Sequence, residues 1–200
     1  MKQLNRRGRR GNSVEQIDLV MIRDNLTAIP RYDLPAGFSY RMFQRGDDVI
    51  WAEIETSAGE FASDDLAAQH FRKEFGKLQQ ELFNRCVFVD TEEGVSIGTA
   101  TAWFGDLLPE KTAGRLHWVA IREKYQGRGI GKPLVSRALQ LLSAFHERAY
   151  LTTQTTSYKA VKIYLDFGFR PYITDESQKK GWSIVSRLLC LPELNIHYGL

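Results

Sequence analysis

The chain has 200 residues, of which 43% are hydrophobic and 26% charged, and its formal net charge is +3. This balance is typical of a globular protein, and the length suits one domain better than two. The longest apolar runs, at 17–22 and 118–121, fall well short of the roughly 20 residues that a membrane-spanning helix needs, so we expect no transmembrane segment.

The N-terminal tip is basic, with four arginines at 6–10. A polar stretch follows where a secretory signal would have its apolar region, so we expect a cytoplasmic protein. We divide the chain into a basic, flexible tail at 1–15 and one domain at 16–200. The tail could bind nucleic acid or an anionic surface, but a solvated terminus is the interpretation we favour.

The domain begins with two strand signals and a helix signal. Residues 17–23 and 38–42 have the apolar pattern of strands. The turn at 46–48 supplies an acid as N-cap, and a helix is predicted at 49–57.

A second helix and a hairpin follow. Asp64 or Asp65 can cap the helix, and its apolar residues recur at roughly helical spacing. Those residues are Leu66, Phe71, Phe75, Leu78 and Leu82. The period then changes to two at 86–89 and 95–104, and the short loop between them has Gly94 where a positive φ is needed. This pattern predicts two adjacent antiparallel strands.

The rest of the chain alternates strands and helices. Strands are predicted at 116–121, 150–155, 169–173 and 182–189, and a helix at 158–167. A longer helix after residue 129 has an apolar stripe made of Ile130, Leu134, Ala138, Leu141, Leu142 and Phe145. The order of elements predicts an α+β domain, in which helices flank a central mixed, mainly antiparallel sheet.

The two cysteines, Cys86 and Cys190, are far apart and lack the spacing of a zinc site. We therefore expect neither a disulfide nor a metal, and we interpret both cysteines as packing residues.

The most informative segment joins a predicted strand to the longer helix through three alternating glycines. It consists of Gln126, Gly127, Arg128, Gly129, Ile130, Gly131 and Lys132. Glycine lets the backbone turn sharply and bring its N–H groups close to a bulky anion. The start of the following helix adds unpaired N–H donors and a positive dipole end. Pro133 falls in the first helical turn, where a missing N–H costs little. The segment therefore predicts a pyrophosphate-binding loop.

Other glycine-rich loops fit less well. A dinucleotide fingerprint has the spacing G-x-G-x-x-G directly after the first strand, and a P-loop has Ser or Thr where this chain has Pro133. A glycine-rich turn without a ligand is the remaining alternative.

The spacing Gln-x-x-Gly-x-Gly at 126–131, between a strand and a helix, resembles the signature of the GNAT N-acetyltransferases. The resemblance implies that acetyl-CoA is the co-substrate and that the loop amides bind its pyrophosphate. It also implies that Val119, Ala120 and Ile121 on the preceding strand offer backbone groups to the pantetheine arm.

A second segment, at 160–169, resembles the family's Asn-x-x-Ala-x-x-x-Tyr-x-x-x-Gly-Phe pattern. Here Ala160, Ile163 and Phe167 share a helical face, and Gly168 can end the helix. The resemblance implies that Tyr164 protonates the departing thiolate. Its phenol has an ordinary pKa of about 10 and the thiolate about 8.5. The family's Asn is Ser157 here, whose hydroxyl could still donate a hydrogen bond to the cofactor. The two motifs anchor a resemblance over roughly residues 38–170.

The acceptor side is less determined by the sequence. Family members often use a Glu on the strand before the loop as a base, whereas this strand offers His117, which is either a base or a packed residue. The acidic residues after the second predicted strand either attract a cationic amine or form a solvated helix face. They are Glu53, Glu55, Glu60, Asp64 and Asp65. Trp51, Phe61, Trp103 and Phe104 either line an apolar pocket or belong to the core.

The resemblance predicts an acetyl-CoA-dependent N-acetyltransferase with a small-molecule or peptide amine as acceptor. Two alternatives stay open, an acyl-CoA-binding protein without turnover and a nucleic-acid-associated protein that uses the basic tail. We expect no membrane partner, we disfavour nucleic acid, and a homodimer stays open.

Overall fold

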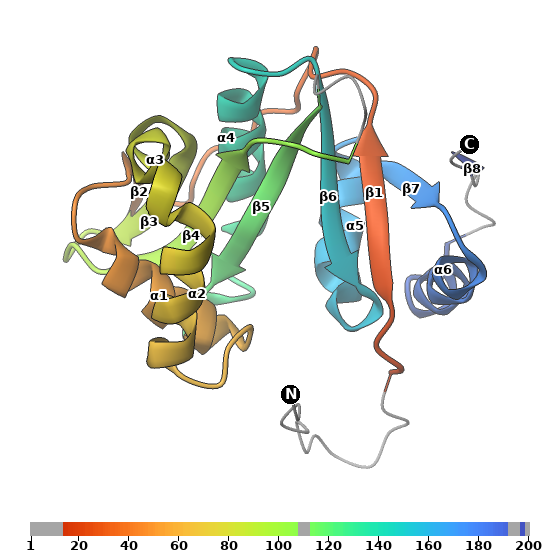
Figure 1. Cartoon of the computed structure of the whole chain (residues 1–200), viewed down its shortest axis with the longest axis horizontal. Coiled ribbons are helices and arrows are strands. Elements are labelled where there is room, and N and C mark those ends of the chain that lie inside the picture. Colours follow the sequence, from red (N-terminus) through yellow and green to blue (C-terminus); the bar gives the residue numbers. More distant parts are fainter. Residues whose placement is uncertain (1–13, 108–112, 192–196, 199–200) are drawn as a thin grey trace.

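The computed structural model describes residues 14–107, 113–191 and 197–198. Within these residues the strands follow one another in the order β2-β3-β4-β5-β6-β1-β7-β8 across a twisted sheet (Figure 1). The strands are β1 (Asp18–Arg23), β2 (Phe38–Met42), β3 (Cys86–Thr91), β4 (Ser96–Trp103), β5 (Ala113–Ile121), β6 (Arg148–Gln154), β7 (Arg170–Ile173) and β8 (His197–Tyr198). The β5–β6 and β7–β8 pairs are parallel and the other pairs are antiparallel. The predicted α+β class with a mainly antiparallel sheet is confirmed. The arginines at 6–10 lie outside the described residues.

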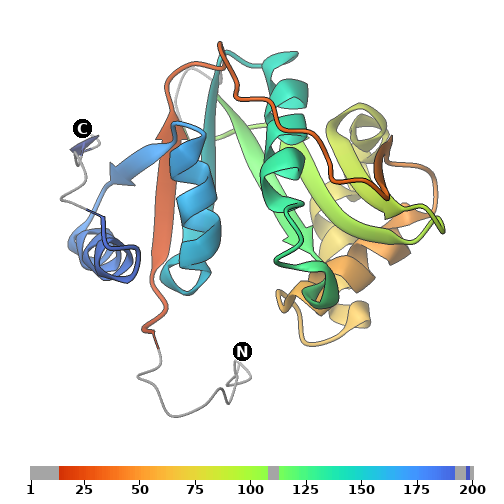
Figure 2. The same cartoon turned by 180° about the vertical axis from the view of Figure 1, so that it is seen from behind.

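Helices cover both faces of the sheet. Figure 1 shows α1 (Asp47–Ala58) and α2 (Asp64–Phe75) in front of β4 and β5, and Figure 2 shows α4 (Gly131–Ser143) and α5 (Tyr158–Asp166) on the opposite face. Two further helices, α3 (Gln79–Arg85) and α6 (Glu176–Leu188), precede β3 and follow β7. Among the described residues, none of the helices combines the length and apolar character needed to span a membrane.

The core is divided by the sheet, because successive strand residues point to opposite faces. On β3, Val87 and Val89 pack with α4, whereas Cys86 and Phe88 pack with Trp51 of α1. Since both faces are covered, β4 is buried along its whole length.

The segment predicted as a strand at 182–189 is instead the second half of α6. The Asp175 side chain accepts a hydrogen bond from the Gln178 backbone N–H at 2.9 Å and so caps the helix. Trp182 and Val185 are buried three residues apart, on one helical face against β1. The strand prediction was wrong because a short apolar run does not show whether its hydrophobic residues repeat with the period of a strand or of a helix.

Smaller predictions also need correction. The second predicted helix is two helices, separated at Gly76, and Leu66 and Leu78 are exposed. Ser63, not an aspartate, caps α2 through a bond from the Leu66 N–H. Phe145 lies beyond the end of α4 and is exposed. Cys190 is exposed as well, whereas Cys86 is buried as expected.

The β5–β6 junction is the feature that shapes the site. The two strands pair only from Ala113 to Arg115, although β5 continues beside β4 to Ile121 and β6 continues beside β1 to Gln154. Figure 1 shows them diverging toward their C-terminal ends. Beyond Arg115, therefore, no described strand pairs with the β6-facing edge of β5.

β5 also contains a bulge. Its register against β4 shifts between Thr99 and Thr101, so that two residues, Trp118 and Val119, lie opposite Ala100. Trp118 has a φ of 48°, which is rare for a residue with a bulky side chain. Strained backbone of this kind persists only where the surrounding structure enforces it.

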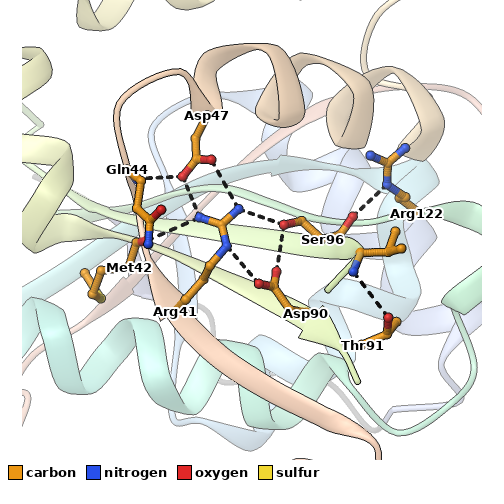
Figure 3. A network of polar contacts seen from close by, with 9 residues as sticks. Arg41, Met42, Gln44, Asp47, Asp90, Thr91, Ser96 and Arg122 are labelled. Atoms are coloured by element: carbon orange, nitrogen blue, oxygen red, sulfur yellow. Dashed lines mark hydrogen bonds and ion pairs between the residues drawn. The ribbon is translucent and has the colours of Figure 1, made fainter. Parts of the chain in front are cut away.

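The start of α1 is fixed by a polar network around Arg41 of β2 (Figure 3). The Arg41 guanidinium donates to Asp47 at 2.5 Å, to Asp90 of β3 at 2.8 Å and to Ser96 of β4 at 2.7 Å. An acid of the turn at 46–48 was expected to act as the cap, but the N-cap residue is Gly46, which has no side-chain bond. Charge-assisted bonds are strong when partly buried, so this network holds α1 in a set position over β3 and β4.

Candidate active site

The predicted pyrophosphate-binding loop follows the free end of β5. The chain makes a short 3₁₀ turn at Glu123–Tyr125 and then passes through Gly127 and Gly129, whose φ values are 77° and 81°. Both glycines are in the left-handed region that other residues avoid. The Gln126 side-chain amide donates to the Ile121 carbonyl at 2.9 Å and closes the base of the loop.

The beginning of α4 leaves its backbone donors free of side-chain caps. The N-cap residue is Ile130, and no side chain caps the helix. The first N–H groups of a helix lack intrahelical partners and carry the positive end of its dipole. Pro133 has no N–H, so the donors that remain come from the residues immediately before it. An anion at this position would meet backbone N–H groups and the positive end of the helix dipole.

The third glycine has a different purpose. Gly131 does not have a positive φ, but a Cβ placed on it would lie 3.0 Å from Cδ1 of Ile163 on α5. Gly131 therefore allows α4 and α5 to approach closely. The Lys132 ammonium lies 3.0 Å from the Asp166 carboxylate and also joins the two helices. The Arg128 guanidinium lies over the Tyr125 ring at 4.9 Å, outside the helix.

The three strand residues predicted to contact the cofactor lie along the unpaired edge of β5. Val119 and Ile121 pack on the core beneath α4, and Ala120 faces α1. Their side chains are used for packing, so the backbone edge is the part of this segment that can bind a ligand. An extended ligand could pair with such an edge as a strand does.

Tyr164 lies on the buried face of α5, with 7% of its surface exposed. That face consists of Val161, Tyr164 and Phe167, while Ala160 and Ile163 lie at its margin. The Tyr164 ring packs edge-on to Phe169 at 6.2 Å. Within the described residues its hydroxyl has no hydrogen-bond partner. Burial raises the pKa of Tyr164, and the carboxylates of Glu60 and Glu55 add to this effect, so the phenol keeps its proton at neutral pH.

Ser157 is half-buried at the N-cap position of α5, and its hydroxyl makes no cap bond there. The hydroxyl is therefore available to a ligand between α5 and the loop.

His117 is buried beneath α2 and its Nε2 contacts the Glu74 carboxylate. Glu74 also contacts His70 at 2.6 Å and accepts a bond from the Trp118 indole at 3.0 Å. Burial acts to raise the pKa of Glu74, but the bonds from His117, His70 and Trp118 lower it to about 2. Burial lowers the pKa of His117, although Glu74 opposes this. His117 is thus neutral near pH 7 with its Nε2–H directed at Glu74, and only Nδ1 is left to accept a proton.

The acidic residues expected near the acceptor do not form one lining. Glu53 pairs with Arg122 at 2.8 Å, and Asp64 and Asp65 lie exposed in the first turn of α2. Glu55, in contrast, is completely buried. Trp51 and Trp103 belong to the core, while Phe61 stacks on Trp118 at 5.4 Å. Among the described residues, no group of three His, Cys, Asp or Glu side chains could hold a metal ion.

Comparison with known proteins places this geometry in a family. A family model described as "Acetyltransferase (GNAT) family" matches residues 48–169, which is more than half of the chain and includes both motifs. The chain belongs to the GNAT family.

Individual GNAT relatives are distant. The mycothiol acetyltransferase of Kineococcus radiotolerans is 26% identical over 162 residues, which cover 77% of this chain and 49% of that protein. A GCN5-related N-acetyltransferase from Sphaerobacter thermophilus superposes with a TM-score of 0.64 at 18% identity, covering 78% of this chain and 48% of that one. A GNAT acetyltransferase from Colwellia psychrerythraea gives 0.60 at 11% identity, covering 78% and 53%. The structural likeness shows the fold, and the chain spans about half the length of the relatives it matches.

Two features of this GNAT site were not predicted from the sequence. The bulge at Trp118 has no local signal, because it depends on the pairing of β5 with β4. The burial of Glu55 did have a local signal in the sequence. Glu55 lies four residues after Trp51 and therefore on the same face of the helix, which is buried.

Proposed function

We propose that this chain is an acetyl-CoA-dependent N-acetyltransferase, which transfers the acetyl group to a primary amine by direct attack of that amine. One observation carries the proposal. The unpaired edge of β5 begins after Arg115 and leads to a loop with free backbone donors. A long ligand with an amide-bearing arm and a pyrophosphate fits such an edge followed by such a loop.

The same geometry supports the residues that we assign to acetyl-CoA. The backbone N–H groups at 127–132 would bind the pyrophosphate, with Arg128 and Lys132 adding positive charge near it. The Gln126 backbone N–H, which was predicted to join them, already donates to the Glu123 carbonyl at 3.2 Å. The backbone at Val119, Ala120 and Ile121 would bind the pantetheine amides. The Ser157 hydroxyl would donate to the same ligand from α5. Acetyl-CoA supplies the activated acetyl group, and the protein supplies position and proton transfer.

Tyr164 is the proposed general acid. Its ring is held by packing in the α5 face of the core, and its hydroxyl is not engaged by any described group. Because its pKa is raised, the phenol is protonated at working pH and can give its proton to the departing thiolate. A positioned acid of this kind contributes about 10² to 10⁴-fold to the rate.

The acceptor is a small-molecule or peptide amine. The named activity of the Kineococcus radiotolerans relative adds one compound to test, the deacetylated form of mycothiol. Glu60 and Glu74 give the acceptor side negative charge, which favours a cationic amine.

The experiment measures thiol release from acetyl-CoA with a panel of amines, with mass spectrometry of the products. The panel contains a polyamine, an aminoglycoside, a lysine-containing peptide and deacetylated mycothiol. Release that requires one of these amines, with its product heavier by one acetyl group, supports the proposal. Tight acetyl-CoA binding without release on any amine would instead support a binding protein. Salt-dependent DNA binding that is lost without residues 1–10 would support a nucleic-acid role.

A further inference from the structure

The connector between β1 and β2, residues 24–37, is a long segment that contains neither helix nor strand. Figure 2 shows it crossing the outer side of α4 on its way from β1 to β2. Connections of this length without secondary structure are uncommon in compact domains and usually have a function. Neither of the two sequence motifs includes the connector, so the assignments made above leave it without a task.

The first half of the connector is held in a fixed path by buried side chains. The Arg23 guanidinium donates to the Thr27 carbonyl at 2.9 Å and to the Phe167 carbonyl at the end of α5. Further along, the Ser136 hydroxyl of α4 donates to the Pro30 carbonyl at 2.7 Å. Arg23 and Ser136 are both buried, where hydrogen bonds are shielded from water. The residues that follow Pro30 are therefore positioned by the fold.

The second half of the connector borders the loop that we assign to the pyrophosphate. In the middle of the loop, a Cβ placed on Gly129 would lie 3.7 Å from Cγ of Pro35. At the end of the loop, the Lys132 ammonium lies over the ring of Tyr32, 5.4 Å from its centroid. The connector therefore brings an aromatic ring to the point where the loop passes into α4.

The ring of Tyr32 is 39% exposed, although it also contacts Phe167 with 5.5 Å between the ring centroids. A single exposed aromatic side chain is ordinary on a protein surface. Here, however, the backbone before the ring is tethered, and Lys132 connects the ring with the proposed anion site. A supported and exposed ring of this kind is a ready surface on which a planar base can stack.

The shape of the ligand requires a group in this place. Acetyl-CoA has an amide-bearing arm and an adenosine half, and the pyrophosphate joins the two. With the arm along β5 at 119–121 and the pyrophosphate at 127–132, the adenosine half must leave the loop on the side away from β5. The connector at 30–35 lies beside the loop, and its exposed ring is that of Tyr32.

Another ring beside the loop is less suitable. The Tyr125 ring has the Lys124 ammonium at 5.1 Å and the Arg128 guanidinium at 4.9 Å from its centroid. Phe38 packs edge-on to the same ring at 6.4 Å. Its surroundings are thus occupied by protein groups, whereas the ring of Tyr32 is exposed.

We propose that Tyr32 binds the adenine base of acetyl-CoA by stacking, with Lys132 between this ring and the pyrophosphate. The inference rests on the proposed use of acetyl-CoA and adds a residue of the connector to the cofactor site. The contact would let the protein distinguish acetyl-CoA from acetyl-phosphopantetheine, which has the same thioester but no nucleotide.

The charges around the ring suit a phosphate-bearing nucleotide. Lys132 and Lys162 share one carboxylate, that of Asp166, so the two ammonium groups exceed their counter-ion by one charge. Arg31 and Asp33 flank the ring in sequence, are both exposed and have opposite charges. The local balance is therefore positive, which favours an anionic ligand.

The test measures binding of CoA and of 4′-phosphopantetheine, which lacks the adenosine half, by calorimetry. The variants are Tyr32→Phe, Tyr32→Leu and Tyr125→Leu, which makes the same change at the other ring beside the loop. Tyr32→Phe keeps the ring and should bind both ligands as the parent does. Tyr32→Leu keeps an apolar contact with Phe167 but has no ring face, so CoA should bind about ten- to a hundredfold more weakly. Its affinity for phosphopantetheine should equal that of the parent.

Tyr125→Leu is the control for damage to the loop, because such damage should weaken both ligands by a similar factor. The inference is overturned if Tyr32→Leu binds CoA as the parent does, if it loses affinity for both ligands equally, or if Tyr32→Phe is as weak as Tyr32→Leu. It is overturned as well if the parent binds the two ligands equally tightly, because the nucleotide then contributes nothing. If Tyr32→Leu does not fold, Tyr32→Met replaces it, since a flexible thioether side chain fills the same contact without a ring.

The outcomes also separate this inference from the proposed function. A parent that does not bind CoA would refute both of them. A parent that releases thiol from acetyl-CoA with an amine, together with a Tyr32→Leu variant of unchanged CoA affinity, would refute the inference alone. A parent that binds CoA with the expected dependence on Tyr32, but releases no thiol with any amine, would refute the proposed acetyl transfer and support the assignment of Tyr32.

Discussion

Replacing Tyr164 with Phe separates catalysis from packing, because it removes only the hydroxyl. The ring keeps its place in the core and its edge-on contact with Phe169 at 6.2 Å. The hydroxyl has no hydrogen-bond partner among the described residues, so its loss should change the free energy of unfolding by less than about 1 kcal/mol. Loss of the general acid should lower the maximal turnover about ten- to a thousandfold, or roughly 1.4 to 4 kcal/mol in activation free energy.

The assay measures kcat by thiol release, acetyl-CoA affinity by calorimetry and stability by chemical denaturation. Tyr158→Phe is the matched control, because it makes the same change on the same helix at a half-buried position. Unchanged turnover of Tyr164→Phe, where chemistry limits the rate, would refute the role. So would a loss of activity that follows a loss of stability or affinity. Since the pKa of Tyr164 is raised, kcat of the parent should show no alkaline decline from this group below about pH 10.

Three further predictions follow from the same structure. Gly129→Val puts a β-branched residue at a φ of 81°, so acetyl-CoA affinity should fall steeply, and parent-like affinity of a folded variant by calorimetry would contradict the loop assignment. Burial raises the pKa of Glu55 in the folded protein well above its ordinary value. The free energy of unfolding of the parent should therefore fall as pH rises from the pKa of Glu55 in the unfolded chain, about 4.3, toward its pKa in the folded protein. Glu55→Gln should therefore have a higher Tm than the parent at neutral pH but a similar Tm near pH 4, and a lower Tm at neutral pH would contradict this reasoning. Removal of residues 1–10 should leave the acetyl-transfer rate unchanged, because the tip precedes both motifs, and loss of thiol release by a folded variant would show otherwise.

The parts of the fold that the sequence predicted are those with local signals. Gly94 and the αL residue Gly168 have the positive φ values that their positions suggested. The hairpin around Gly94 and the order of the strands from β1 to β7 also followed from periodicity and turn residues. By contrast, α6 was predicted as a strand, although Asp175 followed three residues later by Gln178 is a recognisable capping pattern. The strand prediction at 182–189 used the apolar run alone and did not take this capping pattern into account.

The parts of the site that escaped prediction depend on contacts between distant segments. The sequence left His117 as either a base or a packed residue, because its partner Glu74 is 43 residues away in sequence. The strain at Trp118 arises from the register between β4 and β5. The motifs assign Ser157 and the loop, and those assignments stay predictions. The environment of Glu55 depends on the packing of α1 on the sheet and has no motif.

The short β5–β6 junction also has a thermodynamic consequence. Among the described residues, three residue pairs join the half of the sheet that contains β2 to β5 to the half that contains β6, β1 and β7. Two such halves can unfold with different free energies, as partly independent cooperative units. A ligand that pairs with the β5 edge and also contacts α5 would join them as a missing strand does. The two halves would then unfold together in the presence of the ligand. Backbone hydrogen exchange in both halves should slow by a similar factor when acetyl-CoA is added.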